Sequence, residues 1–157
     1  MTPRARTNQL LYQAELLLAV APGDDEHAEA RRMAAEEGAL ALLELALASL
    51  VQELTELTEH ALPADGDWRR LLLSDEVRLA ELERLRGLAE RPDSWLARLL
   101  VRIEALRSSD GVARRSGGAA QGLIAVGGAD DLGAELFDCL REAKREIGAL
   151  RQTNEEW

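Results

Sequence analysis

The sequence predicts an all-α fold, an antiparallel bundle of four to five helices. Its main evidence is the stretch from Glu29 to Glu59, where leucines recur at steps of three and four residues, the spacing that places side chains on one helix face. These leucines are Leu40, Leu43, Leu47, Leu50, Leu54 and Leu57. Hydrophobic residues make up 46% of the 157 residues but aromatic residues only 3%, so the core must be mainly leucine and alanine. Such a core suits packed helices better than a β-sandwich.

The first helix is expected to begin at Thr7 or Asn8, because either side chain can cap the free amides of a first turn. The Pro-Gly pair at 22–23 should end it, and the two aspartates at 24–25 offer a cap for the next helix. Because this connection is short, the first two helices are expected to form an antiparallel hairpin.

The second helix should be the centre of the bundle. Its apolar surface is wider than the seam of a two-stranded coil, since Ala39, Leu42, Ala46 and Val51 flank the leucines. We therefore expect helices to pack on more than one side of it.

A third helical region is expected to start at Trp68 with Asp67 as its cap. The Ser-Asp pair at 74–75 can divide this region into a short helix and a longer one. Pro92 interrupts the helical path because proline lacks the amide hydrogen that a helix needs, and the pattern resumes from Ser94. The tryptophans that open the two regions are expected to cover the core.

Residues 107–130 differ in kind because glycine and serine cluster there. We expect this Gly/Ser-rich loop to be largely a flexible surface segment, with the apolar run at 123–126 extended against the bundle. Asp130 or Asp131 should then cap the last helix. The length matches one ordinary domain, so residues 1–157 are expected to form a single helical-bundle domain.

Charge narrows the range of partners. The formal net charge of −10 opposes attraction to phosphate backbones and to anionic membranes, so we expect no nucleic-acid and no membrane partner. No window approaches the roughly 20 uninterrupted apolar residues of a membrane span. The single cysteine, Cys139, excludes an internal disulfide and fits a reducing compartment. We therefore expect a cytoplasmic protein in which Cys139 is a small core side chain.

No pattern of catalytic or metal-ligating residues stands out, so we expect no enzyme activity, no cofactor and no metal. Two-metal centres of helical bundles use paired Glu-x-x-His motifs. Here Asp24 precedes His27 and Leu57 precedes His60 at that spacing, so the pair is missing. No arginine stands four to seven residues before either histidine, which removes the acid–base pair of a helical ribonuclease.

Two groups of residues are candidates for binding. The first is a polar group near the start of the chain, for which a binding site and a hydrogen-bonded helix entrance are both open: Arg6, Thr7, Asn8, Gln9 and Tyr12. The second is Trp157, which follows two acidic residues. It either contacts a basic pocket on another protein or folds back onto its own bundle.

Three segments carry a likeness to known sequences: RTNQLLYQAELLL at 6–18, EEGALALLELALASLVQEL in the second helix, and RPDSWLARLL at 91–100. Together they resemble a family of small uncharacterised helical proteins from gamma-proteobacteria, a domain of unknown function. The resemblance covers most of the chain, with the glycine-rich segment as its most divergent part. It implies a cytoplasmic bacterial protein and supplies no catalytic residues.

We expect a non-enzymatic interaction protein that binds another protein, or itself as a homodimer, through an acidic helical face or leftover apolar surface. An alternative is a small-molecule or nucleotide-binding bundle with a pocket between the first, second and last helices, near Asn8, Gln9, Tyr12 and Glu37. A third hypothesis is an acidic nucleic-acid mimic, which requires paired rows of negative charge on one exposed side.

Overall fold

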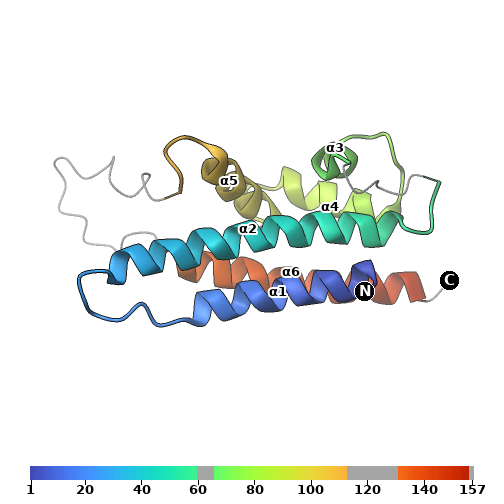
Figure 1. Cartoon of the computed structure of the whole chain (residues 1–157). Helices are drawn as coiled ribbons and strands as arrows, with labels where there is room; N and C mark the ends of the chain where they lie inside the picture. The colour runs from blue at the N-terminus through green and yellow to red at the C-terminus, as the bar shows by residue number, and fades with distance from the viewer. Residues whose placement is uncertain (60–65, 113–130, 156–157) are drawn as a thin grey trace.

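The structure, a computed structural model, describes residues 1–59, 66–112 and 131–155. These residues form six α-helices and no β-strand: α1 (Pro3–Ala19), α2 (Ala28–Thr55), α3 (Trp68–Leu73), α4 (Ala80–Glu90), α5 (Trp95–Arg107) and α6 (Leu132–Glu155). Figure 1 shows α1 and α6 below the long helix α2, and α3 and α5 above it. The predicted all-α bundle is confirmed.

Helix α2 is the centre of the bundle, because it packs against each of the other five helices. Four of the predicted leucines, Leu40, Leu43, Leu47 and Leu50, are buried along it. The prediction was wrong at the far end of the ladder, since α2 ends at Thr55 and Leu57 is 94% exposed in the turn that follows. Helix α2 therefore supplies core contacts over almost its whole length, but not through the last predicted leucine.

Helices α1 and α2 form the predicted antiparallel hairpin (Figure 1). Helix α1 begins at Pro3, earlier than predicted, because the Thr2 hydroxyl accepts a hydrogen bond of 3.2 Å from the Ala5 amide and proline suits a first turn. Thr7 and Asn8 therefore lie inside α1 rather than at its entrance. Leu10, Ala14 and other residues of its inner side are buried.

The connection between α1 and α2 differs in detail from the expected cap. The carboxylate of Asp25 accepts hydrogen bonds from the His27 amide at 2.9 Å and from the Arg31 guanidinium at 2.6 Å. Because α2 begins only at Ala28, Asp25 holds the turn rather than the first helical turn. The side chain of His27 is exposed, and His60 lies outside the described residues.

Helices α3 and α4 are the two pieces into which the third region was expected to divide. Asp67 caps α3 as predicted, because its carboxylate accepts hydrogen bonds from the amides of Arg69 and Arg70. Ser94 caps α5. Between α3 and α4 the chain turns around the buried side chain of Arg86, which donates to the carbonyl oxygens of Leu71, Leu72 and Val77. Trp68 and Trp95, which open α3 and α5, are buried as predicted.

Ion pairs join α6 to its neighbours along every seam. Their partners are Glu15 in α1 with Lys144, Glu53 in α2 with Arg151, Arg84 in α4 with Glu146, and Arg98 and Arg102 in α5 with Glu142 and Glu135. Asp131 is the cap of α6, since its carboxylate accepts a hydrogen bond from the Ala134 amide at 3.3 Å.

Residues 113–130 of the predicted loop, including the run at 123–126, lie outside the described residues. No helix in the described residues has both the length and the apolar character needed to cross a membrane.

Candidate functional site

The polar group at 6–12 does not form one site, because its side chains point in different directions around α1. Thr7 is fully buried and its hydroxyl donates to Ser49 Oγ of α2 at 2.9 Å. Arg6 donates to the Gln9 side-chain oxygen at 2.6 Å on the surface. Asn8 and Tyr12 line a hollow between α1 and α6, and the other three residues of the group do not line it.

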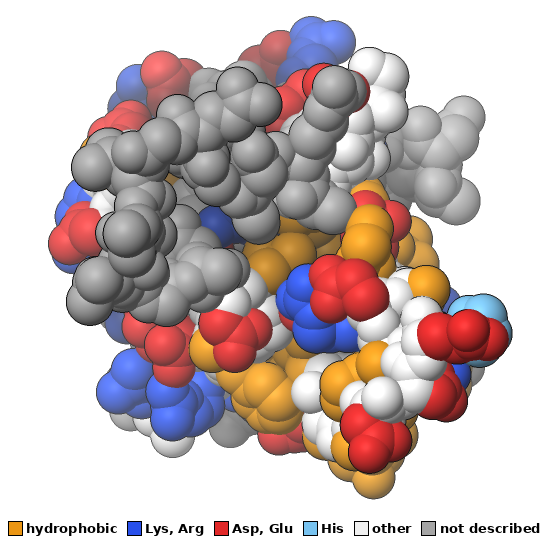
Figure 2. All heavy atoms as spheres, turned by 90° about the vertical axis from the view of Figure 1, so that its left-hand side faces the viewer, with side chains coloured by type: hydrophobic (Ala, Val, Ile, Leu, Met, Phe, Trp, Pro, Cys, Tyr) orange, Lys and Arg blue, Asp and Glu red, His pale blue; other side chains and the backbone are white. Residues whose placement is uncertain are grey.

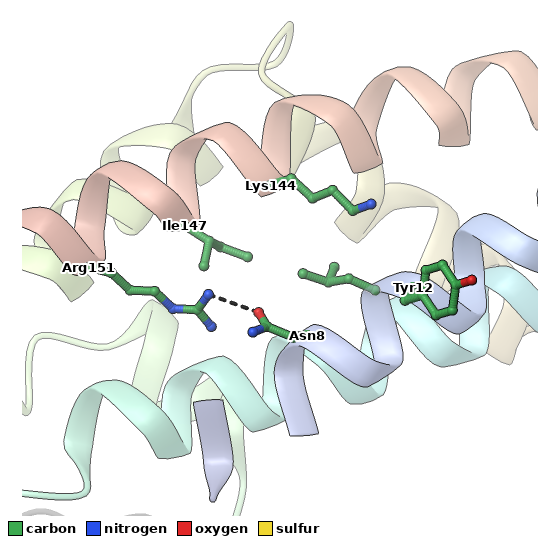
Figure 3. Close-up of a pocket in the computed structure, with 6 residues that line it drawn as sticks. Asn8, Tyr12, Lys144, Ile147 and Arg151 are labelled. Carbon is green, nitrogen blue, oxygen red and sulfur yellow. Dashed lines mark hydrogen bonds between the residues drawn. The ribbon is translucent and has the colours of Figure 1, made fainter. Parts of the chain in front are cut away.

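That hollow is a shallow groove between α1 and α6 with a volume of about 310 Å³. Three residues of α1 and three of α6 line it: Asn8, Leu11, Tyr12, Lys144, Ile147 and Arg151. Figure 3 shows the two cationic side chains and Ile147 descending from α6 toward Asn8 and Tyr12. The groove thus combines an apolar floor with polar walls, close to where a pocket was expected. Gln9 and Glu37 of that prediction do not line it.

Both positive charges of the groove already have carboxylate partners. Arg151 contacts both oxygens of Glu53, at 2.7 and 2.9 Å, and donates to Asn8 Oδ1 at 2.9 Å. Lys144 donates to Glu15 at 2.5 Å. A negatively charged ligand would have to compete with these carboxylates, so the groove has the character of an ion-paired seam.

A second hollow, of about 600 Å³, lies at the end of α5. Apolar and charged side chains line it together: Val101, Glu104, Ala105, Arg107, Ser108, Asp110 and Gly111. The guanidinium of Arg107 is bound to Glu44 of α2. Neither hollow has the leucine lining or the convergent polar lining that would identify a deep ligand pocket.

The outward side of α1 is different, because it carries an uncharged seam. Its members follow spacings of four, three, four and three residues, the heptad pattern of a helix that packs against another helix: Ala5, Gln9, Tyr12, Leu16 and Ala19. Tyr12 is 58% exposed and Leu16 is 49% exposed. Since the opposite side of α1 is buried against α2 and α6, this helix is apolar on two sides.

Helix α2 continues the uncharged surface. Between residues 33 and 55 its exposed residues are Ala34, Ala41, Leu45 and Gln52, none of them charged. Leu45 lies one turn before Ser49, which bonds to Thr7, and two turns after Gly38, whose Cα faces the Leu17 side chain. The exposed row therefore runs beside α1. We call these four residues together with the seam of α1 the hairpin face.

The hairpin face contrasts with the rest of the surface. The exposed side of α6 carries Arg141, Lys144 and Arg145, and that of α4 carries Glu83 and Arg84. Seen from the hairpin end of the bundle, hydrophobic side chains reach the surface between charged groups on the lower side, where Figure 1 places α1 (Figure 2). In a chain that is 31% charged, an uncharged strip along two helices is a marked feature.

The hairpin face was not predicted from the sequence, because the leucine ladder of the core is the stronger pattern on each helix. The signal was present in the spacing of residues 5, 9, 12, 16 and 19 and of residues 34, 41, 45 and 52. Lys144 and Arg151 were also not predicted, because no local pattern brings α6 beside Asn8 and Tyr12. Trp157, the other predicted contact, lies outside the described residues.

The structure describes the setting of the thiol of Cys139 and of the possible metal ligands. Cys139 is buried, and burial raises the pKa of its thiol to about 11, which leaves it protonated and unreactive at neutral pH. Within the same residues, no three His, Cys, Asp or Glu side chains are placed to hold a metal ion.

Comparison with known proteins adds one finding. No curated protein and no solved structure matches the chain. A family model described as a family of unknown function (DUF6586) matches residues 1–157.

Proposed function

The chain belongs to DUF6586, a family of unknown function. For this chain we propose a non-enzymatic role as an interaction protein, in which the hairpin face binds an uncharged helical surface of a protein. The observation that supports this proposal is the uncharged, partly apolar strip on α1 and α2. We further propose that it acts in the bacterial cytoplasm, as the family resemblance and the single cysteine favour.

The physical argument rests on the cost of leaving apolar surface in water. Burying apolar surface contributes about 25 cal/mol per Å², and Tyr12, Leu16 and Leu45 are each about half exposed in the bundle. A partner helix laid along α1 would cover these side chains, while Ala34 and Ala41 would let its own side chains approach closely. The partner must itself be uncharged there, because a charged group buried without a counterion would be strongly unfavourable.

Site-specific photo-crosslinking in cells tests this proposal. A photoreactive amino acid replaces Leu16 or Leu45 on the hairpin face, or Val101 or Leu73 as controls that are also about half exposed. We expect discrete crosslinked products from the first two positions only. A Tyr12→Glu substitution in the same chains should reduce the yield at least about tenfold, because it would bury an unpaired charge.

Either of two crosslinking results would overturn the proposal. Products of equal yield from Leu16 and Val101, or products that persist unchanged with Tyr12→Glu, would show that the hairpin face does not select a partner.

The groove between α1 and α6 supports a second candidate function, binding of a small molecule. It is favoured by the position of Asn8 and Tyr12 on one wall and of Lys144 and Arg151 on the other. A thermal-shift screen of nucleotides and carboxylic acids tests it, with Asn8→Ala as the diagnostic variant. A saturable rise in Tm that Asn8→Ala removes would support this function, and no rise with any compound would reject it.

A further inference from the structure

We infer that the partner of the hairpin face is a second copy of this chain, with the two α1 helices antiparallel and a two-fold axis level with the peptide between Leu10 and Leu11. This inference rests on the proposed function and names its partner. It is carried by the symmetry of the exposed seam and by the distribution of charge along α1.

Four of the five seam residues are spaced symmetrically about the stated axis, and Ala19 lies beyond them. The residues Ala5, Gln9, Tyr12 and Leu16 follow spacings of four, three and four. When a second α1 runs antiparallel about the stated axis, Ala5 of one copy comes level with Leu16 of the other. Gln9 comes level with Tyr12 of the other copy, so an amide and a phenol meet near the centre. Such self-complementarity is what a two-fold interface requires.

Charge selects the antiparallel direction. The N-terminal half of α1 carries Arg4 and Arg6, and its C-terminal half carries Glu15. In the antiparallel arrangement Arg4 comes within about one helical turn of Glu15 of the second copy, and the two lie on the same flank of the seam because eleven residues make about three helical turns. Glu15 keeps Lys144 of its own chain as a further partner. A parallel arrangement would instead place the two arginine pairs beside each other, which is unfavourable between like charges.

The size of the seam indicates a reversible dimer. Helix α1 has 17 residues and is about 25 Å long. One such helix pair buries less than the roughly 1,200 Å² of a standard stable interface, although Ala41 and Leu45 of α2 lie along its edge. We therefore expect a dissociation constant of about 1–100 µM.

Engineered disulfides test the register directly, because the only native cysteine, Cys139, is buried in α6. Ala5→Cys and Leu16→Cys are prepared as separate full-length proteins, and both positions are exposed. In the proposed dimer like positions are eleven residues out of register, about 16 Å along the helix, too far for a disulfide. An equimolar mixture under mild oxidation should therefore give at least about tenfold more covalent dimer than either protein alone.

Other results of this experiment contradict the inference. Covalent dimer from each protein alone but not preferentially in the mixture would show a parallel arrangement. Equal yields in all three samples would show random collision.

Light scattering of the full chain over a concentration series provides the second measurement. The mass should rise toward that of a dimer, Leu16→Glu should raise the dissociation constant at least about tenfold, and Val101→Glu should leave it within about twofold. A mass that stays monomeric at about 500 µM, with a dissociation constant thus far above the expected range, would overturn the inference. Face-specific photo-crosslinks to a different protein would then still support the proposed function, whereas their absence as well would overturn both.

Discussion

The hydroxyl of Thr7 donates a hydrogen bond of 2.9 Å to Oγ of Ser49, which joins α1 to α2 at a buried point of the hairpin. Ser49 in turn donates to the Pro3 carbonyl oxygen at 3.1 Å, so the chain of hydrogen bonds ends at the first turn of α1. This contact lies on the side of α1 that faces the core, opposite the exposed seam.

Removing the buried hydroxyl should weaken the hairpin. We expect Thr7→Val to lower the free energy of unfolding by about 1 kcal/mol, because Ser49 loses a donor while the shape of the side chain is kept. Urea denaturation at equilibrium measures this, and Thr7→Val/Ser49→Ala should cost less than the sum of the single changes. Thr153→Val is the control, since that hydroxyl bonds to the Ala149 carbonyl on the surface. Equal losses at positions 7 and 153 would refute the assignment.

The pair between Arg151 and Glu53 should stabilise the attachment of α6 to α2. Their side chains are only 15% and 12% exposed, so Arg151→Met leaves a largely buried carboxylate without its partner. We expect a loss of about 2 kcal/mol in the free energy of unfolding. Arg141→Met is the matched control, because Arg141 and Asp138 form an exposed pair for which about 0.5 kcal/mol or less is expected. A similar loss from both variants would contradict the structural role of Arg151.

Glycine at position 38 of α2 leaves room for the Leu17 side chain of α1. A Cβ there would lie 3.1 Å from Leu17 Cδ1, so Gly38→Leu should separate the two helices and lower the free energy of unfolding by about 1–3 kcal/mol. At Gly87 in α4 an added Cβ would meet no neighbouring group within 4 Å. Gly87→Leu should therefore raise the free energy of unfolding by about 0.5 kcal/mol, because leucine favours the helix more than glycine does. Chemical denaturation of the two variants measures whether each change in the free energy of unfolding is a loss or a gain. Stabilisation by Gly38→Leu would show that the helices are not in close contact there.

Cys139 should resist labelling in the folded protein. Burial raises the pKa of its thiol to about 11, so little thiolate exists at pH 8, and the sulfur lies in the hydrophobic core out of reach of the reagent. We expect iodoacetamide to react at least about 100-fold more slowly in buffer than in concentrated urea. Because the folded pKa is raised, the stabilising contribution of the neutral thiol is full below the unfolded pKa and is lost as the pH rises toward 11. Rapid native labelling at pH 8 would contradict the burial.

Several features of the fold followed from local sequence alone. The leucine steps in α2 predicted the central helix, and the tight turn at 22–23 predicted the hairpin, because short-range periodicity and turn chemistry act within a few residues. Asp67 was correctly predicted as a cap for the same reason. The sequence pattern also resumed at Ser94, which caps α5. The start of α1 was misplaced because Thr2 with Pro3 is an equally good local signal for a helix entrance as Thr7.

The candidate sites depended on contacts between residues far apart in sequence. Asn8 and Tyr12 lie on one wall of the groove, and its opposite wall comes from Lys144 and Arg151 more than 100 residues later. Only the tertiary structure shows that Glu15 and Glu53 neutralise those cations. It alone also shows which apolar side of α1 is buried.

The sequence by itself determined that the chain is helical, because the side chains of one helix repeat with a fixed local period. The tertiary structure decided which of two apolar sides of α1 faces the core, because that choice depends on how α2 and α6 pack against it. Thr7 and Leu10 turn inward to those helices, and Tyr12 and Leu16 are left at the surface. Burial is a property of the whole packed chain, so no pattern within α1 could decide it.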